Sequence, residues 1–246
     1  MTEFKLNPAL DVEALAQEYA AHGRLQVRDM LTPETAEEIH QRLYGMDWWL
    51  TYNDGETIER LEPHELRSIT RERAAQIQQT VYRNAQSQFQ FLYNYYPLHT
   101  AYFSPKVPAV PLFPVYEFIN SAPFLDFARN LTGLEGIRWA DGQGTLYRST
   151  HFLTGHTDEV PAEKRLAAYV LNFTKDWKID WGGLLQFWDE SGDIERAFTP
   201  TFNALNIFTI PANHSVSMVT PFAPGLRFSI TGWLRGDEPP GTFPAR

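Results

Sequence analysis

Cysteine is absent from this chain of 246 residues. A chain without cysteine has no disulfide framework, no thiolate zinc site, no iron–sulfur cluster and no cysteine nucleophile. Any metal that the protein binds must therefore be held by histidine nitrogen and carboxylate oxygen.

Long apolar runs and excess positive charge are lacking too. No stretch approaches the ~18 continuous apolar residues of a membrane-spanning helix, and the first residues do not resemble a signal peptide. The chain carries 21 Lys and Arg against 30 Asp and Glu, a net charge of −9. This acidic balance argues against nucleic acid and anionic membranes as partners. We therefore expect a soluble, cytoplasmic protein, and the sequence leaves its oligomeric state open.

The composition is that of a folded, globular protein. Hydrophobic residues make up 43% of the chain and aromatic residues 14%, which is typical of a chain with a substantial core. Sandwiches and barrels commonly reach this length as one unit. We therefore expect a single domain over residues 1–246.

The first part of the chain, residues 1–136, has mostly helical patterns. A strand-like alternation covers 24–28, and the proline-rich segment 97–123 is expected to be an ordered loop or edge segment. Helices are predicted at four places, namely 11–21, a segment capped by Thr32, 64–95 and 122–131. This part is expected to support a sheet rather than to carry the chemistry.

From residue 137 the pattern changes to short strands separated by turn signals. Many short strands without intervening helices favour a sandwich, a barrel or a jelly roll over 137–235. The tail, 236–246, is rich in Pro and Gly and is expected to be frayed. The predicted strands are 144–151, 152–158, 166–173, 184–188, 204–210, 214–220 and 226–234.

A candidate metal site begins with His156 and Asp158. Residues two apart on a strand face the same side, so an imidazole and a carboxylate can point at one ion. The pair alone is a weak signal, because a surface His beside a turn Asp is common. His214, in a later predicted strand, would complete a set of two His and one carboxylate. Non-haem iron(II) oxygenases use this set.

A candidate anion site lies in the strand that follows. Arg227 and Ser229 share a face, and a guanidinium with a hydroxyl is a good receptor for a carboxylate. Tyr147, on the strand before His156, can bring a phenol to the same place. Each residue also has a plain structural explanation, but together and in this order they point to one site.

These residues lie in a pattern that resembles a known family. The order HxD, WGG, a distal His and RxS is similar to the iron(II)- and 2-oxoglutarate-dependent dioxygenases. Within them it resembles the prolyl-hydroxylase-type branch, near the ribosomal-protein prolyl hydroxylases. The matching stretches are YRSTHFLTGHTDEV, AAYVLNFTKDWKIDWGGLLQFW, FNALNIFTIPANHSVSMVTPF and LRFSITGWL.

The resemblance implies a fold and a set of roles. The fold would be α+β, mainly β, with a double-stranded β-helix (jelly-roll) core and N-terminal supporting helices. His156, Asp158 and His214 would bind iron(II), and Arg227 would pair with the distal carboxylate of 2-oxoglutarate. Ser229 and Tyr147 would add hydrogen bonds to this carboxylate. A second tyrosine would also contact the cosubstrate, and the candidate is Tyr169. The alternative is that Val170 is the residue of this strand that faces inward. O2 would be the oxidant, and ascorbate is a candidate reductant.

The resemblance also implies a reaction, the hydroxylation of a C–H bond with succinate and CO2 as co-products. The expected substrate is a prolyl residue of a protein or peptide. The alternative is the same chemistry on a free amino acid or another small metabolite. A zinc hydrolase is less favoured, since no placed Glu base is evident and Arg227 would have no purpose. A non-catalytic jelly-roll binding protein is the remaining hypothesis. Asp158 argues against the halogenating relatives, which need its coordination position for halide.

Elements that would face the substrate are harder to assign. The candidates are the segment 104–114, the aromatic residues near Trp48 and the stretch 159–165. Arg148 and Arg165 could contact an anionic substrate, although a solvated role suits each equally well. His151 lies five residues before His156, and we expect it on the opposite face, in a structural role.

Overall fold

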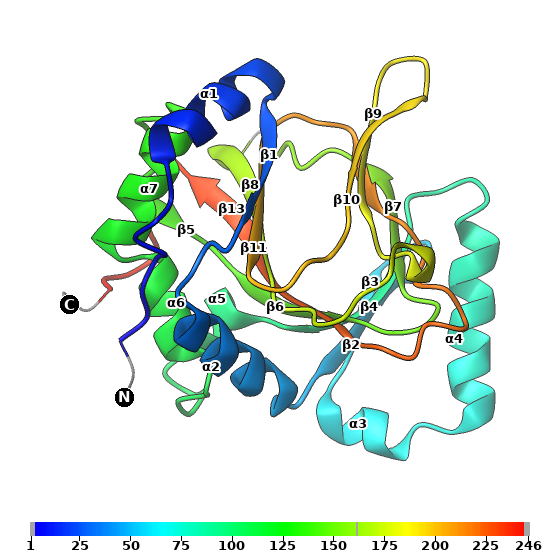
Figure 1. Cartoon of the computed structure of the whole chain (residues 1–246). Coiled ribbons are helices and arrows are strands. Elements are labelled where there is room, and N and C mark those ends of the chain that lie inside the picture. The colour runs from blue at the N-terminus through cyan, green and yellow to red at the C-terminus, as the bar shows by residue number, and fades with distance from the viewer. Residues whose placement is uncertain (1–2, 161, 244–246) are drawn as a thin grey trace.

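A 13-stranded antiparallel sheet that curls into a jelly roll dominates the fold. The computed structural model describes residues 3–160 and 162–243. Figure 1 shows helices α1, α2, α6 and α7 gathered against one side of the curled sheet, and α3 and α4 at its other end. The expected fold class, a double-stranded β-helix with supporting helices, is confirmed.

The strands come from both parts of the chain. They are β1 (Arg24–Arg28), β2 (Trp49–Asn53), β3 (Ile58–Leu61), β4 (Phe91–Tyr96), β5 (Trp139–Ala140), β6 (Gln143–Tyr147), β7 (Phe152–His156), β8 (Arg165–Asn172), β9 (Leu185–Trp188), β10 (Ile194–Phe198), β11 (Ala204–Thr209), β12 (His214–Val216) and β13 (Arg227–Arg235). Their order across the sheet is β1-β11-β8-β13-β6-β4-β7-β12-β9-β10, while β2, β3 and β5 lie off this path.

The helices lie almost entirely in the first part. They are α1 (Val12–His22), α2 (Pro33–Tyr44), α3 (Pro63–Ser68), α4 (Arg71–Asn84), α5 (Leu98–Tyr102), α6 (Phe113–Ile119) and α7 (Ala122–Thr132), with a short 3-10 turn, η1 (Ile179–Trp181). No helix in the described ranges is both long and apolar enough to cross a lipid bilayer.

Helix α2 begins as its sequence predicts. The Thr32 side chain accepts a hydrogen bond from the Thr35 amide, and Pro33 occupies the first turn, where no backbone donor is needed. Its apolar residues Ile39 and Leu43 are fully buried. Burial of this stripe against the sheet fixes the helix in place.

The predicted helix over 64–95 is wrong. It is two helices, α3 and α4, separated by extended backbone at Ile69 and Thr70, and Thr70 caps α4 by accepting from the Arg73 amide. The end of the segment is strand β4. Its aromatic residues favour a pleated surface, and their spacing also fits a helical period over a short window. The first part therefore supplies strands β2, β3 and β4 to the sheet as well as helices.

Two further predictions need correction. The proline-rich segment 97–123 is not a long loop, because it contains α5, α6 and the start of α7. Pro114 lies in the first turn of α6, a position that tolerates proline. Strand β10 is absent from the predicted strands, since four of its five residues are exposed and give no apolar alternation.

Side chains join the two ends of the main strand path. Arg24 on β1 forms a 2.6 Å ion pair with Glu195 on β10, and its guanidinium lies over the ring of Phe187. Gln26 donates a 3.1 Å hydrogen bond to the carbonyl of Thr199, just beyond β10. These contacts bring β1 and β10 together without backbone pairing, and the curled sheet encloses a cavity.

Candidate active site

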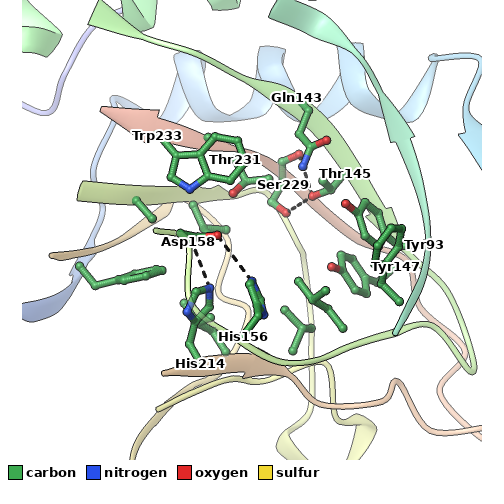
Figure 2. A pocket seen from close by; sticks show the side chains of 18 of the residues that line it. Tyr93, Gln143, Thr145, Tyr147, His156, Asp158, His214, Ser229, Thr231 and Trp233 are labelled. Atoms are coloured by element: carbon green, nitrogen blue, oxygen red, sulfur yellow. Dashed lines mark hydrogen bonds and ion pairs between the residues drawn. The ribbon is translucent and has the colours of Figure 1, made fainter. Parts of the chain in front are cut away.

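The cavity inside the jelly roll has a volume of about 210 Å³. The side chains that line it come mainly from β4, β6, β7, β8, β12 and β13 (Figure 2). Both the first part of the chain, 1–136, and the second, 137–235, therefore contribute to the cavity. The lining residues are Phe89, Phe91, Tyr93, Gln143, Thr145, Tyr147, Leu153, His156, Asp158, Ala168, Val170, Leu185, Phe208, His214, Val216, Arg227, Ser229, Thr231, Gly232 and Trp233.

An irregular strand pairing turns His156 into the cavity. On β12, His214 pairs with His156 and Val216 with Leu153, so three steps along β7 oppose two along β12. A bulge of this kind re-aims a side chain. Leu153 and His156 therefore both line the cavity, although simple alternation would place them on opposite faces.

Asp158 reaches the same point from beyond the strand. Strand β7 ends at His156, so the argument from two residues on one strand face does not describe how the pair converges. Instead, Arg165 on β8 donates a 3.1 Å hydrogen bond to the backbone carbonyl of Asp158. Glu163 holds Arg165 in a 2.7 Å ion pair, and the guanidinium stacks 3.4 Å from the ring centre of Trp233. Arg165 is therefore a structural support rather than a free substrate contact.

The three predicted metal ligands meet at one point. The Nε2 atom of His156 lies 3.6 Å from one Asp158 oxygen, and the Nε2 atom of His214 lies 3.4 Å from the other. One ligand atom from each residue falls within 4.8 Å of the others. Figure 2 shows both imidazoles turned towards the carboxylate.

The second nitrogen of each imidazole is already engaged. Nδ1 of His156 lies 2.9 Å from the carbonyl of Thr154, and Nδ1 of His214 lies 2.9 Å from the carbonyl of Ala212. A carbonyl only accepts, so each Nδ1 carries hydrogen and each Nε2 keeps a free lone pair. The set of two imidazole nitrogens and one carboxylate fits iron(II).

The charge of Asp158 also suits a cation. Burial pushes the pKa of this carboxyl upward, but the adjacent imidazoles of His156 and His214 outweigh burial and bring the pKa below its ordinary value. The carboxyl is thus ionised at neutral pH and ready to bind metal.

At the other end of the cavity lies Arg227, which is 2% exposed. Its Nε atom has no hydrogen-bond partner, and within the described ranges no carboxylate pairs with the guanidinium. Burial lowers the pKa of Arg227, but an arginine stays charged in proteins. A buried, unpaired cation is costly, and this one therefore indicates a site for an anion.

Glycine makes room for Arg227. Gly182 and Gly183 make the turn into β9, with φ of +67° and +65°. A Cβ on Gly183 would lie 3.1 Å from the Cδ of Arg227. The turn thus needs glycine both for its backbone conformation and for the close approach of this side chain.

The other predicted polar residues also lie in this end of the cavity. Ser229 is buried and shares a 2.6 Å hydrogen bond with Thr145 on the adjacent strand β6. Tyr147 is buried beneath the Arg227 guanidinium, whose Cζ lies 4.7 Å from the phenol ring centre. Burial raises the pKa of Tyr147 above its ordinary value, so its hydroxyl keeps its proton.

Tyr169 is predicted to contact the cosubstrate, and that prediction is wrong. Its side chain is fully buried on the opposite face of β8, where its hydroxyl donates a 2.6 Å hydrogen bond to the carbonyl of Asp141. The neighbouring Val170 lines the cavity instead. The pairing of β8 with β13 fixes the strand register and decides between the two residues.

Several residues that line the cavity are absent from the predicted site. Thr145 and Thr231 lie two residues from Tyr147 and Ser229 on the same strands, so the period of two could have found them. Tyr93 could not be found in that way, because its segment also fits a helical spacing. It contacts Tyr147 face to face, at 5.0 Å between ring centres.

The residues expected to face a substrate lie elsewhere. The cavity lining contains no residue of 104–114 and no described residue of 159–165. Trp48 does not line it either. Trp48 is 8% exposed and belongs to the main hydrophobic core. Arg148 donates a hydrogen bond to Asn94. His151 is buried outside the cavity, as expected for a structural residue.

A comparison with protein families agrees with this geometry. Residues 142–235 match the model of the 2OG-Fe(II) oxygenase superfamily. This segment is a 2OG-Fe(II) oxygenase domain. Enzymes with this domain are 2-oxoglutarate-dependent dioxygenases, which use iron(II), 2-oxoglutarate and O2. A search of curated protein sequences gave no match.

Solved structures show the same fold at low sequence identity. A prolyl-4-hydroxylase from Pseudomonas putida has a TM-score of 0.55 at 17% identity, over 92% of this chain and 100% of that chain. A Burkholderia pseudomallei oxidoreductase of the 2OG-Fe(II) oxygenase family has a TM-score of 0.62 at 11% identity, over 97% and 98% of the two chains. A prolyl hydroxylase from Trichoplax adhaerens, in complex with a peptide fragment of the hypoxia inducible factor oxygen degradation domain, has a TM-score of 0.55 at 12% identity, over 92% and 89%.

Proposed function

We propose that this oxygenase hydroxylates a prolyl residue of a protein or peptide and releases succinate and CO2. One observation carries the proposal, a single cavity with a His–Asp–His cluster at one end and a buried, unpaired guanidinium at the other. The prolyl part is supported by the fold, which is similar to two prolyl hydroxylases, one of them solved with a peptide.

In this proposal, His156, Asp158 and His214 hold the iron. The bound metal supplies the redox chemistry by which O2 oxidises an unactivated C–H bond. The two Nδ1 hydrogen bonds to backbone carbonyls fix the imidazole orientation and leave Nε2 for the metal. Arg165 holds the loop that carries Asp158.

Arg227 binds the distal carboxylate of 2-oxoglutarate, with Tyr147 and Ser229 beside it. A charge-assisted contact in a buried cavity fixes the orientation of the cosubstrate, so its 2-oxo acid end is directed to the His–Asp–His cluster. Apolar side chains that include Leu153 and Val216 surround the cavity and keep water from it.

Phe89 is the residue at the opening that suits a prolyl ring. It lines the cavity, is 43% exposed, and its ring centre lies 5.4 Å from that of His156. An exposed aromatic ring beside a metal ligand offers a flat apolar surface to an incoming substrate.

The proposal is tested in two stages. First, the metal-free protein is titrated without O2, with iron(II) and then 2-oxoglutarate, and followed by visible absorption. We expect a metal-to-ligand charge-transfer band that requires both additions and is lost in Asp158→Ala. No band from folded, metal-loaded protein would contradict the assigned site and favour a zinc hydrolase or a binding protein.

In the second stage, the iron-loaded protein is incubated in air with 2-oxoglutarate, proline-containing peptides and ascorbate as reductant. We expect one added oxygen atom on a prolyl residue by mass spectrometry, with matching succinate. Hydroxylation of free amino acids, with peptides unchanged, would contradict the peptide substrate and establish the small-molecule alternative.

A further inference from the structure

The carboxylate end of the cavity contains a second phenol, Tyr93, that arrives from strand β4. Tyr93 and Tyr147 stack with an angle of 11° between their rings. The Arg227 guanidinium lies over the Tyr147 ring. Figure 2 shows both tyrosine hydroxyls turned the same way, into the cavity.

This phenol compensates for an apolar residue on β8. Val170, not a tyrosine, is the side chain that β8 presents to the cavity, and the neighbouring Tyr169 donates its hydrogen bond to Asp141 on the other face. Strand β8 therefore supplies no hydrogen-bond donor from these two residues to an anion at Arg227. Tyr93 supplies one from β4, which lies beyond β6 on the other side of β13 from β8.

The hydroxyl of Tyr93 is in a suitable state to donate. Burial raises its pKa to about 12, so it is protonated at neutral pH. The Gln143 side chain acts in the opposite direction and lowers that pKa. A protonated phenol that is turned into the cavity can donate its hydrogen to an acceptor there.

We propose that Tyr93 donates a hydrogen bond to the distal carboxylate of 2-oxoglutarate, beside Arg227 and Tyr147. This assignment rests on the proposed role of Arg227. It makes β4, a strand outside the family-matched segment 142–235, part of the cosubstrate site.

The test is the affinity of 2-oxoglutarate, measured without turnover. The full chain is loaded with Mn(II) in place of iron(II) and titrated by calorimetry without O2. Tyr93→Phe removes one oxygen and keeps the ring stack, so we expect it to fold and to bind 2-oxoglutarate about tenfold more weakly, as for the loss of a hydrogen bond to a charged group. Its affinity for Mn(II) should not change.

Tyr95→Phe is the matched control. Tyr95 lies on the same face of β4, two residues along, but its phenol hydrogen-bonds to Arg60 rather than facing the cavity. We expect Tyr95→Phe to bind 2-oxoglutarate within about twofold of the original protein, because the contact that it loses does not involve the ligand. Equal weakening by both variants, or no weakening by Tyr93→Phe, would overturn the proposal.

Two further measurements distinguish a failure of this inference from a failure of the proposed function on which it rests. The ligand 2-oxopentanoate has the same chain length but lacks the distal carboxylate, so Tyr93→Phe should not weaken its binding. A similar loss with both ligands would overturn the assignment to that carboxylate. Arg227→Met tests the site itself. If it leaves 2-oxoglutarate affinity unchanged, the proposed cosubstrate site is wrong, whereas a loss with Arg227→Met but not with Tyr93→Phe refutes only Tyr93.

Discussion

The two ends of the cavity satisfy their polar groups in opposite ways. At the end with His156, Asp158 and His214, each imidazole has one nitrogen on a backbone carbonyl and the other facing a carboxylate. At the other end, Arg227 is buried without an ion-pair partner among the described residues. The first end is organised before any ligand arrives, whereas the second is completed by its ligand.

The largest expected effect is at the organised end. Asp158→Ala removes the carboxylate and should reduce succinate formation by at least about 100-fold, since a metal site is more sensitive to its ligands than to their supports. Thermal unfolding of the metal-free variant should stay close to that of the original protein. Ordinary turnover by this variant would show that Asp158 is no ligand.

The segment between β6 and β7 carries a buried histidine, His151, that should make stability depend on pH. Burial lowers the pKa of His151 to about 4, from 6.5. Between these values the unfolded chain binds a proton that the folded protein does not. The stability present above pH 6.5 is therefore lost as the pH falls towards 4, by about 3 kcal/mol.

His151→Gln should remove that part of the pH dependence. The measurement is the free energy of unfolding in urea at about pH 7 and about pH 4.5, for both proteins. Equal losses on acidification in the two proteins would refute the contribution of His151.

Arg227→Met should weaken ligand binding but raise the stability of the ligand-free protein. Loss of a charged contact should weaken 2-oxoglutarate binding by about 1.5–3 kcal/mol. The same change removes an unpaired buried charge, so the ligand-free protein should become more stable by about 1 kcal/mol. Calorimetry and urea unfolding measure the two effects. A variant with lower ligand-free stability would mean that Arg227 already has its partner inside the protein.

The smallest effect is expected from the support of the metal end. Arg165→Lys keeps the charge but loses the planar group that contacts Glu163, Trp233 and the Asp158 carbonyl. Metal affinity should fall by about tenfold, as for other supports of a metal ligand. The control is Arg196→Lys on the exposed strand β10. If both variants bind metal equally well, the loop does not depend on Arg165.

The organised end is easier to predict from the sequence than the other. His156, Asp158 and His214 stand out because a chain without cysteine can bind this kind of metal only through histidine nitrogen and carboxylate oxygen, and it has only 7 histidines. Arg227 and Ser229 follow from the alternation of one strand. These residues lie in the second part of the chain, where short strands and turn signals are clearest.

The remaining site residues depend on contacts that a local pattern does not contain. Val170, rather than Tyr169, faces the cavity because of how β8 pairs with β13, and one step in register exchanges the two faces. Tyr93 escapes prediction because aromatic residues three or four apart suit a helix as well as a strand. The bulge that turns His156 inward arises from pairing with a distant strand, which the sequence near His156 does not reveal.

Strand β4 limits how far the chain can be shortened. One edge of β4 pairs with β6 and then with β7, while the other pairs with β2. A fragment limited to 142–235 would lose this strand and leave β6 and β7 with unpaired backbone, an edge of the kind that promotes aggregation. It would also lose Phe91 from the cavity wall. The smallest cooperative unit is therefore larger than the recognisable oxygenase segment, and insertions are better tolerated in the exposed turn between β9 and β10 than cuts before β6.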